Sequence, residues 1–506
     1  MFVRQKKNKS GTISVQIIDK SSGNYKVVKT IGIAFGEEDL KELLNAGQEY
    51  IHSQIGQHNI DFDLGDDMHF YQSVYENLQS IYLLGPELVL GKLFDEVGFN
   101  KIKDTLFRDL VISRLIYPAS KLKTIDYLIK YKGIVYEKDQ VYRYLDKLHK
   151  EQIARVQEIS YTHTIKILQA DISVVFYDVT TLYFEAEDED DLRKTGFSKD
   201  GKHQQPQILL GLLVSAGGYP LDYEIFEGNT FEGHTMLSVV ESFKKKHDLQ
   251  QLIIVADAGL MSTNNISQLI EKGYEFIIGA RIKNESQALQ NQILSQKLKD
   301  GESIALSKTE NLRLILSYSE SRAKNDEHNR TRGLNKLEKA LKRGKLTKQH
   351  INNKGYNKYL VLKGEIQIEI DYAKFSADKK WDGLKGYITN TNLDKQVIIE
   401  HYKQLCQIEK TFRISKTDLR IRPIYHQKKR RIEAHICIAF AACKIYKELE
   451  RQLKQNKSEL SPEKAIEILK TIYGINLKLP QSQIVKQMLL DKTMEQKLIL
   501  RLFKII

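Results

Sequence analysis

Residues 172–178 read Ile-Ser-Val-Val-Phe-Tyr-Asp, a short apolar segment that ends in an acidic residue. Residues 252–257, Leu-Ile-Ile-Val-Ala-Asp, have the same character. Apolar runs of this length, rich in β-branched residues, are typical of strands buried inside a sheet. We therefore expect two central strands, one ended by Asp178 and the other by Asp257.

The segments around these two strands extend the same sheet. Residues 208–214 and 221–226 are apolar and are separated by a hairpin-type turn, Ser-Ala-Gly-Gly-Tyr-Pro. A helical pattern over about 234–246, a helix that stops at Gly273 and a strand over 276–279 follow. Three strands in hairpin order, then helix, strand, helix and strand, is the element order of an RNase H-like domain. The expected fold class is α/β, with a mixed five-stranded sheet of this type and flanking helices.

The residues before this sheet have two patterns. Residues 12–33 alternate apolar and polar around Ser-Ser-Gly-Asn, which predicts a β-hairpin. From about Glu37 to Leu168 the apolar spacing is helical. A compact helical bundle can carry a helix-turn-helix, although bundles without any role on DNA are commoner. Both interpretations stay open on the pattern alone.

Composition limits the class of protein. The 506 residues carry 78 Lys and Arg against 65 Asp and Glu, a net charge of +13 that favours a polyanionic partner. No segment approaches the roughly 20 apolar residues of a membrane span. The three cysteines form no C-x-x-C pair, so neither a disulfide framework nor a structural zinc site is expected. We expect a reduced, cytoplasmic protein without a membrane partner.

The positive charge is concentrated in two segments. Residues 322–348, predicted as a polar helix, hold ten Lys and Arg against three acids, a net charge of +7. Such a run is usually a solvated face, and the alternative is a DNA-contacting insertion. Residues 410–431 hold nine Lys and Arg against one acid, a net charge of +8. The density of the second segment fits contacts to a phosphate backbone.

The two aspartates are candidates for chemistry. Side chains at the carboxyl ends of central strands converge on one edge of an α/β sheet, where sites are usually built. Carboxylates there suit Mg²⁺, which prefers oxygen ligands. A helix N-cap or a turn is the alternative role for Asp178 or Asp257 taken alone. Two such residues in matching places favour the metal site.

A third carboxylate is expected on a helix from Lys395 to about Lys416. Tyr402, Glu409 and Lys416 are spaced by seven residues, close to two turns, so they share one stripe about 10 Å apart. Apolar residues share this stripe, and an unpaired buried charge is costly. A metal ion near Glu409 and DNA phosphates near Lys416 explain the two charges. The alternative is that both reach water at the edge of the face.

These motifs resemble insertion-sequence transposases of the DDE class that carry the signature Y-x2-R-x3-E-x6-K. It reads here as Tyr402, Leu405, Glu409 and Lys416, and Leu405 replaces the arginine, so no phosphate contact is assigned to it. The other matches are Tyr177-Asp-Val-Thr-Thr-Leu-Tyr-Phe-Glu, Phe226-Glu-Gly-Asn-Thr, Val255-Ala-Asp-Ala-Gly and Asp418-Leu-Arg-Ile-Arg-Pro-Ile-Tyr-His-Gln.

The resemblance implies a set of site residues. Asp178, Asp257 and Glu409 would be the catalytic, metal-binding triad, with two Mg²⁺ ions for which Mn²⁺ can substitute. The DNA-binding residues would be Tyr402, Lys410, Arg413, Lys416, Arg420 and Arg422.

The resemblance also implies a function. The chain would bind the terminal inverted repeats of an insertion sequence and target DNA, as a homodimer in the synaptic complex. It would cleave and transfer DNA strands by two-metal-ion phosphoryl transfer, without a covalent protein–DNA intermediate. It would be a prokaryotic, nucleoid-associated protein. The alternatives are a catalytically silent DNA-binding regulator derived from a transposase and an RNase H-like nuclease.

The expected domain organisation follows from these assignments. It comprises a β-hairpin arm (1–36), a helical DNA-binding region (37–168), the first part of the catalytic core (169–304), an inserted β-rich subdomain (305–385), the second part of the core with the Glu409 helix (386–450) and a helical tail (451–506).

Overall fold

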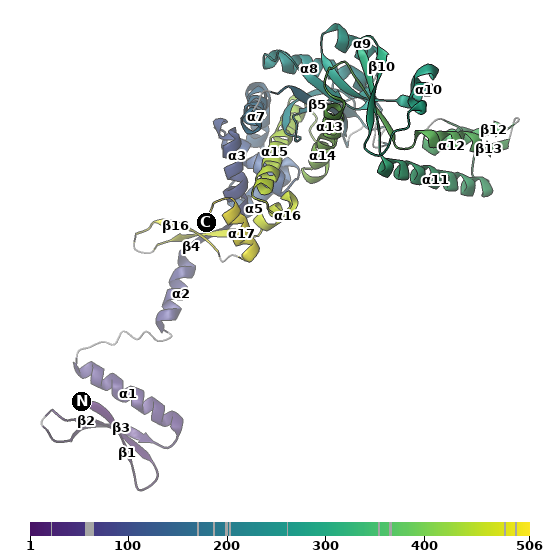
Figure 1. Cartoon of the computed structure of the whole chain (residues 1–506). Coiled ribbons are helices and arrows are strands. Elements are labelled where there is room, and N and C mark those ends of the chain that lie inside the picture. The colour runs from purple at the N-terminus through teal and green to yellow at the C-terminus, as the bar shows by residue number, and fades with distance from the viewer. Residues whose placement is uncertain are drawn as a thin grey trace. The chain divides into compact units, whose positions relative to one another are not determined.

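The chain forms two compact units in the computed structural model (Figure 1). One comprises Met1–Ser80 with Ile475–Met488, and the other Ile81–Gly474 with Leu489–Ile506. The structure describes residues 1–21, 23–55, 65–169, 172–185, 188–197, 201, 204–260, 262–352, 355–363, 367–479, 482–490 and 493–506.

The first unit begins with a three-stranded antiparallel sheet. Strands β1 (Phe2–Lys7), β2 (Ile13–Asp19) and β3 (Lys26–Ala34) lie in that order, and helix α1 (Glu37–Ile55) packs against them. The expected hairpin is confirmed as β2 and β3, to which β1 adds a strand. Helix α2 (Gly65–Asn77) follows in the chain.

A second small sheet has the strand order β16 (Val485–Leu489), β15 (Tyr473–Lys478) and β4 (Leu78–Leu83). The expectation of helices alone over 37–168 and over 451–506 is therefore wrong at these strands. The partners β4 and β15 are almost 400 residues apart in the chain, and helical periodicity carries no signal for such a pairing.

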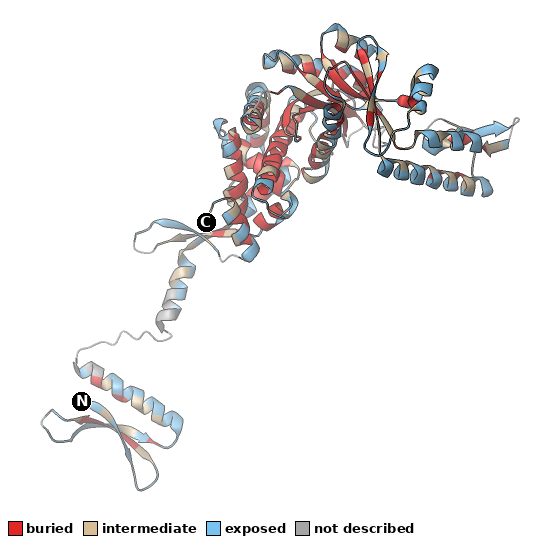
Figure 2. Cartoon of the chain, in the orientation of Figure 1, coloured by how far each residue is buried: buried red, intermediate tan, exposed pale blue. Residues whose placement is uncertain are grey.

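A helical bundle is built from the N-terminal and C-terminal segments of the second unit. Its longest member is α15 (Lys429–Gln455), which contacts α3, α4, α6 and α7 and is buried over most of its length (Figure 2). The remaining members are η1 (Glu87–Gly91), α3 (Lys92–Val97), η2 (Phe99–Lys101), α4 (Thr105–Ile116), α5 (Lys121–Lys132), α6 (Lys138–Lys147), η3 (Leu148–Gln152), α7 (Ile153–Leu168), α16 (Pro462–Leu469) and α17 (Met494–Leu502).

The central sheet of the second unit is mixed and has eight strands in the order β10-β11-β14-β9-β8-β5-β6-β7. Strand β8 is parallel to both β5 and β9, and the other neighbouring strands are antiparallel. The strands are β5 (Val174–Tyr183), β6 (Gln207–Val214), β7 (Pro220–Glu227), β8 (Ile253–Ala256), β9 (Glu275–Ala280), β10 (Ser303–Thr309), β11 (Leu312–Tyr318) and β14 (Leu384–Thr389).

The expected α/β class is confirmed, whereas the expected number of five strands is wrong. Strands β5 to β9 are the five that the sequence predicts. Strand β14 pairs with β9 and carries β11 and β10 beyond it, so the sheet continues past its expected edge. The pairing joins segments more than 100 residues apart, which local patterns do not reveal.

Helices cover both faces of this sheet. Alternate residues of β5 point into different cores: Tyr177 packs with Met236 of α8 (Thr235–Lys246), and Phe176 belongs to the core that contains Ile408 of α14 (Leu405–Arg413). Helix α9 (Thr263–Glu271) lies on the α8 side, and α13 (Lys395–Lys403) lies with α14. The two faces therefore have separate hydrophobic cores.

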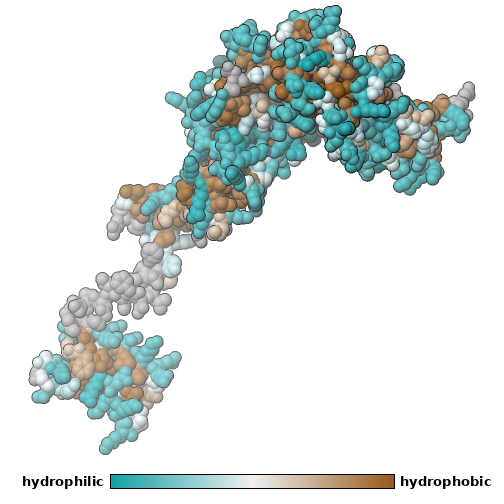
Figure 3. Space-filling model, in the orientation of Figure 1, coloured by the Kyte–Doolittle hydropathy of each residue, from teal (hydrophilic) through white to brown (hydrophobic). Residues whose placement is uncertain are grey.

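An excursion of residues 319–383 leaves the sheet after β11 and returns to it at β14. It contains α11 (Glu320–Lys342), η7 (Lys348–His350), η8 (Gly355–Tyr359), β12 (Leu360–Lys363), β13 (Gln367–Ile370), α12 (Tyr372–Asp378) and η9 (Lys379–Trp381). It has a small core of its own around Leu337 and Tyr359. Helix α11 is hydrophilic on the face shown in Figure 3. Of the strands expected in 305–385, β12 and β13 lie in this excursion, and β11 belongs to the central sheet.

Among the described helices, none combines the length and the apolar composition that a membrane-spanning helix requires.

Candidate functional site

The two predicted aspartates stand at the end of one parallel ladder. Strands β5 and β8 pair from Val174 with Ile253 to Tyr177 with Ala256. The same register, continued by one residue, sets Asp178 beside Asp257. The expectation that Asp178 ends its strand is wrong, because the other edge of β5 pairs with β6 as far as Tyr183. Asp178 therefore lies where the parallel pairing stops and the antiparallel pairing goes on.

Local backbone groups orient both carboxylates. Asp178 is half-buried, and its Oδ1 accepts a hydrogen bond of 2.8 Å from the backbone N–H of Val179. Asp257 is exposed, and its Oδ1 accepts bonds from the N–H groups of Gly259 at 2.8 Å and Leu260 at 3.3 Å. Asp257 therefore stabilises the turn that follows β8, which is the alternative role considered above, and it also stands directly after that strand.

Glu409 is exposed on α14, which packs against β5. The expected continuous helix through Tyr402, Glu409 and Lys416 is wrong in detail. It breaks at Gln404, whose N–H bonds to both the Glu400 and the His401 carbonyls, and neither Gly nor Pro marks this break in the sequence. Lys416 lies in the π-helix η10 (Ile414–Asp418), so the three residues do not share one regular stripe.

Tyr402 connects two of the three acids electrostatically. Its side chain is buried, and burial, the charge of Asp257, Tyr387 and the charge of Glu409 raise its pKa to about 12. Its hydroxyl lies over Gly279 of β9, in space that a Cβ at that position would fill. The charges of Asp257 and Glu409 thus both act on one largely buried phenol, and the DNA contact expected of Tyr402 stays a prediction.

A cavity of about 1010 Å³ adjoins this tyrosine, which lines it. It is lined by Ala258, which follows Asp257, and by residues of the excursion such as Arg322. Lys385 of β14 also lines it, with Nζ 4.4 Å from the centre of the Tyr402 ring. Burial and the charge of Arg322 lower the pKa of Lys385, and the charge of Glu409 opposes them.

Sequence reasoning missed Lys385 because it belongs to neither basic segment. The signal that was available is a single lysine in the otherwise uncharged run Leu384-Lys-Gly-Tyr-Ile-Thr.

A family model for the Transposase DDE domain matches residues 169–443. The chain belongs to this family. The match extends from just before β5 into α15, so it includes all three carboxylates and the whole excursion. Its members act in DNA transposition and recombination.

Comparison with solved structures finds other transposases at low similarity. They are the piggyBac transposase synaptic complex with hairpin DNA (9% identity, TM-score 0.39, 77% of this chain and 79% of that chain), the Drosophila P element transposase strand transfer complex (9%, 0.21, 71% and 82%) and the Mos1 mariner paired end complex with Mn (13%, 0.15, 31% and 48%). No curated protein matches the chain.

The basic residues of this transposase beyond Glu409 have different environments. Lys410 forms an ion pair with Glu450 of α15, which also accepts from Lys447. Burial opposes these two bonds, yet they bring the pKa of Glu450 to about 2. Lys410 thus pairs with an acid of the protein itself. A DNA phosphate would have to compete with Glu450 for its ammonium group.

The other cations predicted to bind DNA remain accessible. Arg413 and Arg420 are exposed, and Lys416 and Arg422 are half-buried. The Arg422 guanidinium lies 5.5 Å from the ring centre of Tyr183, at the end of the strand that carries Asp178.

The three carboxylates offer hard oxygen ligands from three neighbouring elements. Within the part of the chain that the structure describes, no three His, Cys, Asp or Glu side chains stand together closely enough to hold a metal ion. The donor types therefore fit a hard divalent cation, while the side chains are not gathered into a finished coordination shell.

Proposed function

We propose that this transposase binds the terminal inverted repeats of an insertion sequence and catalyses metal-dependent DNA cleavage and strand transfer at Asp178, Asp257 and Glu409. The observation that carries the proposal is the parallel register of β5 and β8, which brings the two aspartates to one edge of the sheet. The packing of α14 against β5 supports Glu409 as the third acid. The order β7-β6-β5-β8-β9 supports an RNase H-like catalytic core.

Asp178, Asp257 and Glu409 would hold two Mg²⁺ ions, with Mn²⁺ as a substitute, because carboxylates are the ligands that such hard cations prefer. Ions held by these three carboxylates would supply Lewis-acid chemistry, namely activation of a water or a DNA 3′-hydroxyl and stabilisation of the leaving oxygen. The protein supplies the geometry. The Asp257 turn fixes one carboxylate, and the buried Tyr402 holds α13 against β9 between Asp257 and Glu409.

The exposed and half-buried cations that follow Glu409 would hold the DNA in register. Arg413, Lys416, Arg420 and Arg422 follow Glu409 within a segment of net charge +8, and contacts of this kind go to phosphates rather than to bases. Two element ends must be joined, so we expect a homodimer in the synaptic complex, acting in a prokaryotic cytoplasm.

Cleavage of a labelled duplex that ends in the element's inverted repeat tests this function. We expect nicking at the repeat with Mg²⁺ or Mn²⁺ and none with EDTA. Asp178→Ala, Asp257→Ala and Glu409→Ala should each reduce the rate at least 100-fold. Glu271→Ala, which removes an exposed carboxylate at the end of α9, is the matched control and should cleave normally. Equal cleavage by the three triad variants and wild type would exclude the proposed site.

The same assay separates the two alternatives. Binding of the repeat without cleavage under any metal condition would identify a DNA-binding regulator. Cleavage without joining of the 3′ end to a target duplex would identify a nuclease.

A further inference from the structure

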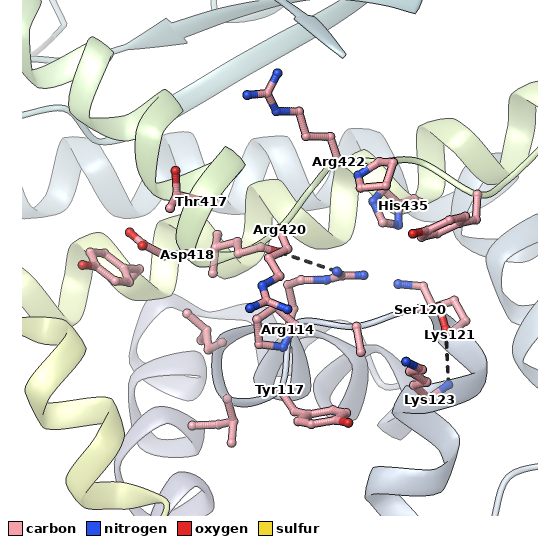
Figure 4. A pocket seen from close by; sticks show the side chains of 18 of the residues that line it. Arg114, Tyr117, Ser120, Lys121, Lys123, Thr417, Asp418, Arg420, Arg422 and His435 are labelled. Atoms are coloured by element: carbon pink, nitrogen blue, oxygen red, sulfur yellow. Dashed lines mark hydrogen bonds between the residues drawn. The ribbon is translucent and has the colours of Figure 1, made fainter. Parts of the chain in front are cut away.

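A second cavity, of about 940 Å³, lies in the helical part of the second unit (Figure 4). Its walls are the end of α4, the start of α5, residues 417–426, α15 and α16, and none of the three carboxylates lines it. Its volume lies in the range of cavities that bind small molecules. The cavity therefore needs an explanation other than the proposed metal site.

Two buried cations line this cavity without an acidic partner. Arg114 is 4% exposed and Lys121 is 5% exposed. Arg114 Nη1 donates one bond of 3.5 Å to the Leu419 carbonyl, and in the described part of the chain neither side chain forms an ion pair. Removing one unpaired charge from water costs several kcal/mol, so two such cations side by side require compensation.

The electrostatics of the cavity agree with a missing anion. Burial lowers the pKa of Arg114 to about 10, and burial with repulsion from Arg114 lowers that of Lys121. His435 is buried, and among the described residues its Nδ1 has no hydrogen-bond partner. Burial and the charges of Arg114, Lys121 and His426 lower the pKa of His435, which favours a neutral imidazole beside the two cations.

The acidic residues that line the cavity interact with groups other than Arg114 and Lys121. Asp418 points away from Arg114 and Lys121 in Figure 4. Glu463 accepts a hydrogen bond from the Tyr446 hydroxyl, and Glu467 pairs with Lys470 at 2.6 Å. None of these acids therefore compensates the two cations, and an anion bound in the cavity would supply that charge.

The start of α5 adds to the positive field. Ser120 caps this 12-residue helix by accepting the Lys123 N–H at 3.4 Å, and residues 120–123 line the cavity. The N-terminus of a helix carries partial positive charge and open N–H groups, which favour phosphate.

We propose that this cavity is a phosphate-binding subsite in which Arg114, Lys121 and the start of α5 receive a phosphate of a DNA strand. Arg420 and Arg422 of the basic segment 410–431 line the same cavity, which favours DNA over a free phosphate as the source. The assignment of DNA rests on the proposed function, whereas the chemistry of the subsite does not.

Thermal unfolding of the full chain tests the subsite directly. We compare phosphate with chloride at equal ionic strength for wild type, Lys121→Met and Arg114→Met. Lys130→Met, an exposed lysine of the same helix α5, is the matched control. At ten times the Kd for phosphate, Tm should rise by about 2–4 °C for wild type and control and by nothing for the two cavity variants.

The source of the phosphate is tested with a fluorescent repeat duplex and with a nucleoside monophosphate. Lys121→Met should weaken duplex binding and reduce the salt slope by about 1, the value for one lost phosphate contact. An unchanged slope, or competition by the monophosphate at concentrations similar to those of the duplex, would exclude DNA as the source.

The outcomes remain distinguishable from those of the cleavage assay. A wild type whose Tm does not respond to phosphate would overturn the subsite, even where the Met variants fail to fold. A phosphate response that is lost in the variants, in a protein that never cleaves DNA, would support the subsite and reject the proposed catalysis.

Discussion

The hydroxyl of Tyr402 on α13 occupies the space above the Gly279 backbone on β9 that a Cβ at this position would need. This contact joins a helix on one face of the sheet to a central strand, and it holds the tyrosine between Asp257 and Glu409. The absence of a side chain at residue 279 thus lets the Tyr402 hydroxyl approach β9 close to Ala258, the residue after Asp257.

Gly279→Ala should therefore disturb the site without unfolding the protein. Overpacking at such a contact costs about 1–3 kcal/mol. We expect α13 to shift and DNA cleavage to fall at least 10-fold. The double variant Gly279→Ala with Tyr402→Phe, which removes the colliding hydroxyl, should recover part of the loss. Cleavage rates and melting temperatures of the single and double variants check this, and a double variant as slow as Gly279→Ala would contradict it.

Lys410 and Arg413 should have separable roles although both belong to the same basic segment. Lys410→Met leaves the buried Glu450 with fewer partners and should lower the free energy of unfolding by about 1–3 kcal/mol. Arg413→Met removes an exposed charge and should leave stability unchanged while it weakens DNA binding. Urea unfolding and the salt dependence of duplex binding measure the two effects. If Lys410→Met weakened DNA binding and left stability unchanged, while Arg413→Met lowered stability, the result would show that Lys410 contacts DNA.

Lys444 should make stability depend on pH. It is fully buried on α15, where it donates to Thr164, and burial lowers its pKa to about 7 from 10.5. Between these values the unfolded chain binds more protons, so stability rises with pH, by up to about 1.4 kcal/mol per pH unit. Lys444→Met should flatten this rise. Urea unfolding at pH 7, 8.5 and 10 measures how the free energy of unfolding changes with pH. Lys429→Met, at an exposed lysine of the same helix, is the control and should show the same pH dependence as wild type.

Divalent cations should stabilise the folded protein through the carboxylates. We expect Mn²⁺ to raise the Tm of wild type and of Glu271→Ala, and to have little effect on Asp257→Asn. In EDTA, Asp257→Asn should be no less stable than wild type, because the substitution reduces repulsion among three acids. Differential scanning calorimetry with and without Mn²⁺ decides this, and an equal response of Asp257→Asn would mean that the ion binds elsewhere.

The strands that carry the site were predictable because their signal is local. An apolar run such as residues 252–256 followed by Asp257 specifies both a buried strand and a carboxylate at its end. The extent of the sheet was not predictable in this way. Strand β14 could pair with any open edge, and its choice of β9 depends on packing across more than 100 residues.

The same distinction holds within the site. The seven-residue spacing of Tyr402, Glu409 and Lys416 predicted helical structure there, but the break at Gln404 has no Gly or Pro that would mark it in the sequence. The orientation of Lys410 depends on Glu450, 40 residues later on another helix. The single lysine in the run 384–389 is a weak signal, and the place of Lys385 over the Tyr402 ring depends on the pairing of β14 with β9.

Tyr318 at the end of β11 and Leu384 at the start of β14 are direct antiparallel partners. The chain therefore leaves the sheet and re-enters it at neighbouring points, so a tight turn would close the same ladder in place of residues 319–383. The length of this segment can change without altering the register of any strand, because loop closure depends only weakly on loop length. The β11–β14 connection is thus a point at which residues 319–383 could be exchanged or removed without moving the strands that carry Asp178 and Asp257.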